Sequence, residues 1–163
     1  MNAKKLSFLL LILVAVACTN RSTSSEQDEM RHWNNVLQQI NALLLENKAR
    51  QTLDLAKQTL PEILESAEKN GTTDTLIYYA RKIFNACGNN YINTKQYKDG
   101  IDYMDSIGNH PLIREHCPHE LLSFKAGLNQ LYGNNPEAVR LAEDYLQLPV
   151  CTSAVSYTHL RAH

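Results

Sequence analysis

The sequence has few of the residues and motifs that usually carry catalysis. Its 163 residues include only four cysteines, six glycines, three phenylalanines and one tryptophan. It has no glycine-rich phosphate loop, no Gly-x-Ser-x-Gly elbow and no visible pair of carboxylates set against an apolar pocket. We therefore expect no enzymatic activity in this chain and no cofactor, and an enzyme is the least favoured of the functional classes considered below.

A strong charge of one sign is also missing. The formal net charge is −1, but Lys4, Lys5 and Arg161 stand in unusual terminal segments. Without these three, the 16 basic residues become 13 against 17 acidic residues, a net charge of −4. A mildly acidic body does not favour a nucleic-acid partner.

Only one long hydrophobic run is present, from Leu6 to Val16, directly after Lys4 and Lys5. It is too short for a permanent membrane span and fits a secretory signal peptide, which we place at residues 1–17. The motif Ala15-Val16-Ala17-Cys18 resembles the lipobox of bacterial lipoproteins, with alanine where leucine is usual. This resemblance implies a lipid on Cys18 and a membrane-anchored protein of the cell envelope, on the periplasmic side or at the outer membrane. The alternative is an ordinary cleaved signal that a cysteine happens to follow.

Three further cysteines, Cys87, Cys117 and Cys151, define no disulfide framework because their number is odd. Export would place them in an oxidising compartment, where a bridge between Cys87 and Cys117 is possible. We favour buried packing for Cys87.

Residues 18–27 are polar and predict a flexible tether, whereas residues 28–149 predict an all-α domain. Apolar residues recur there at steps of three and four, and no stretch alternates with period two. We expect helices that begin near residue 25 or 26, at 72 or 73, near residue 97, at residue 118 and after a cap at residue 135. A further helix contains Leu53, Ala56 and Leu60, and the helices are arranged in antiparallel pairs. Pro61 should kink the second helix or start a short new one.

Each expected helix has its own apolar stripe. The predicted buried residues are Trp33, Val36, Leu37, Ile40, Leu43 and Leu44; Leu53, Ala56, Leu60, Ile63, Leu64 and Ala67; Leu76, Ala80, Ile83, Cys87 and Tyr91; and Leu121, Phe124, Leu128 and Leu131. Asn135 is the expected cap of the last helix, with Pro136 in its first position.

These helix pairs repeat. In the stretch from Phe84 to Pro111, Gly88 and Gly100 are small residues at which we expect the helices over 72–94 and 97–107 to approach closely. Tyr91, Tyr97 and Ile107 are the large packing residues around them. A second copy follows, in which Ala126 corresponds to Gly88 and Ala138 to Gly100. Each residue of the second copy follows its counterpart by 38 residues, and we call this offset the repeat step.

The pattern resembles a tetratricopeptide repeat, whose usual period of about 34 residues is slightly shorter than the repeat step. Cys87 departs from the family's first-helix leucine, and Gly100 departs from its alanine. The resemblance extends over about Asn34 to Leu148 and implies a short α-solenoid of antiparallel helix pairs. A helical bundle with chance similarity is the alternative.

Four histidine and cysteine side chains lie close together in "HPLIREHCPH": His110, His116, Cys117 and His119. Nitrogen and sulfur ligands suit zinc, but their spacing matches no common zinc finger. We expect solvated histidines in a connection between helices and no metal site.

A polar strip is expected on the helix over 72–94, formed by Lys82, Asn85, Asn89 and Asn93 at steps of three, four and four. In the tetratricopeptide register these positions line the concave groove, where they could hold a peptide carboxylate or another polar ligand. The matching positions of the helix from residue 118 are Glu120, Ser123, Gly127 and Gln130. The alternative is a solvated helix face without a ligand.

The last residues fit no helical pattern. Val155 to His163 can be encoded by GTCTCTTATACACATCTCCGAGCCCAC, which resembles a transposon-end adapter used in sequencing libraries. We therefore interpret residues 150–163 as a truncated end with a non-native tail, and we expect the natural sequence to diverge between Cys151 and Ala154.

A lipoprotein-like leader followed by degenerate repeats is similar to the sensory half of tetratricopeptide sensor histidine kinases. This resemblance implies a module that binds a protein or peptide, anchored to the membrane by an N-terminal lipid, in front of a signalling domain. The chain itself contains no phosphoacceptor motif and no ATP site. A free-standing lipoprotein scaffold of an envelope complex is the competing interpretation.

Overall fold

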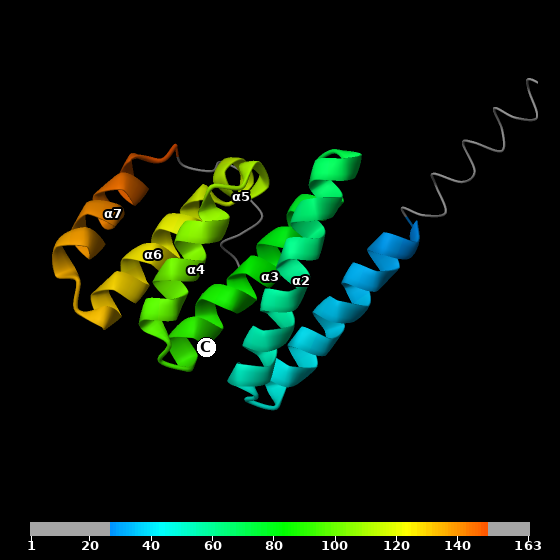
Figure 1. Cartoon of the computed structure of the whole chain (residues 1–163), viewed down its shortest axis with the longest axis horizontal. Helices are drawn as coiled ribbons and strands as arrows, with labels where there is room; N and C mark the ends of the chain where they lie inside the picture. Colours follow the sequence, from blue (N-terminus) through cyan, green and yellow to red (C-terminus); the bar gives the residue numbers. More distant parts are fainter. Residues whose placement is uncertain (1–26, 150–163) are drawn as a thin grey trace, which may run out of the picture. The chain divides into compact units, whose positions relative to one another are not determined.

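The computed structural model describes residues 27–149, and every regular element in this range is a helix (Figure 1). The all-α prediction is confirmed for these residues. Cys18, most of the expected tether, Cys151 and the predicted foreign tail lie outside the described residues. The helices span residues 27–45, α2 (Ala49–Asn70), α3 (Asp74–Asn93), α4 (Tyr97–Gly108), α5 (Pro111–His116), α6 (Pro118–Tyr132) and α7 (Asn135–Gln147).

The chain divides into two compact units inside α3, between Ala86 and Cys87. Unit 1 contains the helix over residues 27–45, α2 and the first part of α3. Unit 2 contains the end of α3 and the four helices that follow. The two units are described separately.

In unit 1, the helix over residues 27–45 and α2 form an antiparallel hairpin. The Ser66 hydroxyl donates to the Glu29 carboxylate over 2.8 Å, and His32 Nε2 lies 3.7 Å from the Glu62 carboxylate. The predicted stripes form the core between them, with Trp33, Val36, Ile40, Leu53, Ala56, Leu60, Ile63, Leu64 and Ala67 all buried. Three predicted core residues are exceptions: Leu37 and Leu43 are half-buried, and 41% of the surface of Leu44 is exposed.

The helix α2 continues through Pro61 rather than ending there. Pro61 is exposed, and residues on both sides of it, Leu60 and Ile63, are completely buried. The expectation of a separate short helix after Pro61 is therefore wrong. Burial of one continuous apolar stripe outweighs the single backbone hydrogen bond that proline cannot donate.

Three helix–turn–helix connections share one backbone geometry. Asn47, Lys95 and Gly133 each follow a helix with a positive φ, of 56°, 58° and 94°. In each turn the next amide, at Lys48, Gln96 or Asn134, donates to a carbonyl five residues earlier. This is the Schellman termination of a helix. Lys95 and Gly133 are separated by the repeat step, so the turns recur with the same offset as the two predicted copies.

The predicted apolar stripe of α3 is confirmed. Leu76, Ala80 and Ile83 in unit 1, and Cys87 and Tyr91 in unit 2, are at most 8% exposed. The helix is capped by Thr73, whose hydroxyl accepts a hydrogen bond from the Leu76 amide over 3.2 Å. Cys87 and Cys117 are both buried, and the disulfide considered between them is not formed.

The connection between α4 and α6 contains a helix that the sequence did not predict. Pro111 supplies the first turn of α5, and Leu112 and Ile113 are buried. The six residues of α5 lie between α4 and α6.

Two further expectations in unit 2 need correction. Asn134, not Asn135, takes the capping position of α7, and its side-chain amide donates to Asn129 Oδ1 over 2.9 Å. In α6, Leu128 is fully buried, Leu121 and Phe124 are half-buried, and Leu131 is 48% exposed.

Candidate partner-binding site

The polar strip, defined as Lys82, Asn85, Asn89 and Asn93, lies on α3 as predicted from helical spacing. Lys82, Asn89 and Asn93 are exposed, and Asn85 is half-buried. Ile83 and Cys87, on the opposite side of the same helix, have no exposed surface. The helix therefore separates a packing face from a face that a ligand can reach.

The amide groups of the strip are not used by the fold. Within residues 27–149, the side chains of Asn85, Asn89 and Asn93 make no hydrogen bond. Each amide offers two donors and one acceptor, a set that matches the backbone of an extended peptide or a carboxylate. The strip thus presents hydrogen-bonding capacity that only water or a ligand can satisfy.

Lys82 has a neighbour that the sequence analysis did not identify. Its ammonium lies 5.6 Å from the centre of the Tyr78 ring, and Tyr78 is 51% exposed. Tyr78 is one helical turn before Lys82, so it extends the strip by an aromatic ring. The spacing of four residues between Tyr78 and Lys82 could have indicated that both lie on one face of the helix.

In unit 2, α6 contributes the second set of predicted positions. Ser123 and Gln130 are exposed, and Glu120 is half-buried. Nothing lies within 4 Å of a Cβ atom built on Gly127, so there is open space at this position. The repeat step relates Asn93 of α3 to Leu131 of α6, not to Gln130. The residue of α6 that corresponds to Asn93 is therefore apolar.

The close approach at Gly88 is real, but the neighbouring helix differs from the expected one. A Cβ atom on Gly88 would meet the ring of Phe124 in α6 at 2.5 Å, whereas α4 was expected there. Gly100 of α4 approaches both Leu128 and Tyr91, each at 3.0 Å from a built Cβ. Of the remaining packing positions, Tyr91 and Ala138 are buried, and Tyr97 and Ala126 are half-buried.

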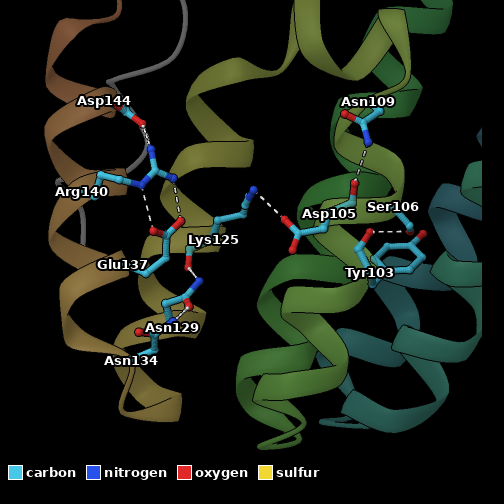
Figure 2. A network of polar contacts seen from close by, with 10 residues as sticks. All are labelled: Tyr103, Asp105, Ser106, Asn109, Lys125, Asn129, Asn134, Glu137, Arg140 and Asp144. Carbon is cyan, nitrogen blue, oxygen red and sulfur yellow. Dashed lines mark hydrogen bonds and ion pairs between the residues drawn. The ribbon is translucent and has the colours of Figure 1, made fainter.

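A network of polar contacts joins α4, α6 and α7 (Figure 2). The Lys125 ammonium lies 2.6 Å from the Asp105 carboxylate, and the buried Asn129 amide donates to the Lys125 carbonyl over 2.9 Å. On α7, Arg140 bonds both Glu137 and Asp144. These groups already have partners within the chain, so we regard the network as structural.

The half-buried Tyr103 and the buried Cys87 form a polar pair between α4 and α3. The Cys87 thiol lies 3.8 Å from the Tyr103 hydroxyl. Burial raises the pKa of the Tyr103 phenol well above its ordinary value, and the neighbouring Cys87 raises it further. A phenol held neutral in this way is a packing group and not a base at neutral pH.

The histidine-rich stretch is structural as well. His110 caps α5, since its Nδ1 accepts a hydrogen bond from the Leu112 amide over 3.1 Å, and the ring of His119 packs edge-on against Tyr145. His110, His116 and His119 are half-buried and Cys117 is fully buried, so the expectation of solvated loop histidines is wrong. Among residues 27–149, no three His, Cys, Asp or Glu side chains are grouped to hold a metal ion.

Comparisons add no relative. No family model, curated protein or solved structure matches this chain. None of the helices described between residues 27 and 149 is both long and apolar enough to cross a membrane.

Proposed function

We propose that this chain is a membrane-tethered, extracytoplasmic helical module that binds a protein or peptide partner through the polar strip of α3. It forms the sensory N-terminal part of a longer signal-transduction protein of the histidine-kinase type. The tetratricopeptide-like arrangement and the lipid on Cys18 belong to this proposal, and they rest on the sequence patterns described above.

The proposal rests on the side-chain amides of the polar strip, which make no hydrogen bond within the described residues. Asn85, Asn89 and Asn93 place amides on one face of α3, and no hydrogen bond within the described chain occupies them. Lys82 adds a positive charge at the N-terminal end of the same face. A peptide segment supplies the complementary groups, namely backbone carbonyls and amides along its length and a carboxylate for the lysine.

A second candidate is a free-standing lipoprotein scaffold of an envelope complex. The complete native gene distinguishes the two candidates. A membrane span and kinase motifs downstream support the sensor, whereas a stop codon soon after another helix pair supports the scaffold.

The proposal is tested by capture from envelope extract of the native organism. The bait is the wild-type chain, compared with Lys82→Ala and Asn89→Ala. The matched controls are Lys57→Ala and Asn41→Ala, which remove the same groups from exposed positions on two other helices. We expect both strip variants to lose a protein that both controls retain. Equal capture by all five baits, with unchanged circular dichroism, would contradict the proposal.

A further inference from the structure

The outer face of α7, defined as Val139, Ala142, Glu143 and Leu146, is apolar but open. Val139 is 58% exposed and Leu146 is 81% exposed, and Ala142 and Glu143 are exposed as well. The steps between these residues place them on one side of the helix. The other side, with Ala138 and Leu141, is buried where α7 packs against α6.

The equivalent face of α4 contacts α6. The repeat step relates Val139, Ala142, Glu143 and Leu146 to Ile101, Met104, Asp105 and Gly108. Met104 has no exposed surface, and a Cβ on Gly108 would meet Leu121 of α6 at 3.0 Å. Asp105 lies 2.6 Å from the Lys125 ammonium of α6. On α4 this face is therefore an established interface with the helix that follows it.

The chemistry of α6 defines what the outer face of α7 accepts. Leu121, Lys125 and Leu128 are at steps of four and three, and all three contact α4. Glu143 corresponds to Asp105, which pairs with Lys125 of α6. A helix that packs on α7 therefore needs a basic residue opposite Glu143. Val139 and Leu146 offer apolar surface on either side of that charge.

We infer that the outer face of α7 is the docking surface for one further helix, which follows α7 in the native chain and repeats the pattern of α6. The same repeat step, applied to Leu121, Leu128 and Lys125, places its apolar contacts at positions 159 and 166 and its basic residue at position 163. The printed residues His159 and His163 belong to the tail that the sequence predicts to be foreign. This inference rests on the internal correspondence of α4 and α7 and does not depend on the polar strip.

An extended chain tests the inference. Residues 147–163 are replaced by a second copy of residues 109–133, so that a copy of α6 follows α7 at the same distance at which α6 follows α4. We expect a higher urea midpoint than that of the original chain, together with a larger helical signal. Leu146→Ser should abolish the increase in the extended chain and leave the original chain unchanged, because Leu146 is exposed there.

The charge pair provides a second, reciprocal test. Glu143→Lys should lower the midpoint of the extended chain, and changing the appended lysine at position 163 to glutamate should restore it. An extended chain with an unchanged midpoint, or with an increase that Leu146→Ser leaves intact, would overturn the inference. A concentration-dependent dimer of the original chain that Leu146→Ser abolishes would assign the face to a second copy and would also overturn it.

Discussion

The ring of Phe124 lies against the backbone of Gly88, so close that a Cβ atom on this glycine would meet three ring carbons at 2.5 Å. The contact joins α6 to the end of α3 inside unit 2. It leaves no room for any side chain at position 88.

Gly88→Leu should therefore destabilise the protein by about 1–3 kcal/mol through overpacking. Gly127 provides the matched control, because it is also in a helix and nothing lies within 4 Å of its built Cβ. Gly127→Ala should stabilise the protein by about 0.5–1 kcal/mol, the usual gain from replacing a helical glycine. Both free energies of unfolding can be measured with urea. If Gly88→Leu unfolds at the wild-type midpoint, the packing of α3 on α6 is wrong.

Tyr103 predicts a loss of stability at alkaline pH. Burial raises the pKa of its phenol in the folded protein, whereas the unfolded chain ionises near the ordinary value of about 10. Its contribution is fully present below pH 10 and is lost as the pH rises beyond it, by up to about 1.4 kcal/mol per pH unit.

The measurement is urea unfolding between pH 9 and pH 11. Tyr103→Phe should flatten the decline in the free energy of unfolding, and Tyr78→Phe, at a half-exposed position, should not. The same slope in wild type and Tyr103→Phe would show that this phenol is not held neutral by the fold.

Cys18 should carry a lipid when the protein is expressed with its leader in a bacterial host. Metabolic labelling with a fatty acid should mark the wild-type protein and leave Cys18→Ala unlabelled. Equal labelling of both proteins would exclude lipidation at this cysteine.

Deletion of Ala154 to His163 should change neither the helical signal nor the stability, because a foreign segment has no reason to contribute to the core. The native gene should diverge from the printed sequence near Ser153. An uninterrupted genomic locus that encodes the whole tail would refute the adapter interpretation.

Helical spacing predicted the elements with long apolar stripes well. The burial of Leu76, Ala80, Ile83, Cys87 and Tyr91 follows from their spacing alone, because one face of a helix must be covered by something. Spacing does not say which helix covers it, and the neighbour of Gly88 was therefore assigned to α4 instead of α6.

The remaining errors have local causes. The helix α5 has only six residues, too few to show a periodic stripe, and two prolines around it suggested a loop. Leu44 and Leu131 continue apolar stripes, so their type predicted burial that the packing does not provide. The turns at Asn47 and Lys95 use a backbone conformation normally associated with glycine. Asparagine also adopts it, but a lysine gives no signal for it in the sequence.

For the strip, the sequence predicted the accessible face of α3 correctly but did not predict Tyr78 beside Lys82. The function of the strip depends on its ligand, and the spacing of residues along a helix does not identify a ligand. The most direct measurement is the affinity of the captured partner for the purified chain, determined by calorimetry for wild type, Lys82→Ala, Asn89→Ala and the Asn41→Ala control. We predict that Lys82→Ala weakens binding by about 1.5–3 kcal/mol, more than ten-fold in Kd, that Asn89→Ala weakens it by about 0.5–1.5 kcal/mol, and that Asn41→Ala has no effect. Equal dissociation constants for all four proteins would show that the strip is a solvated helix face.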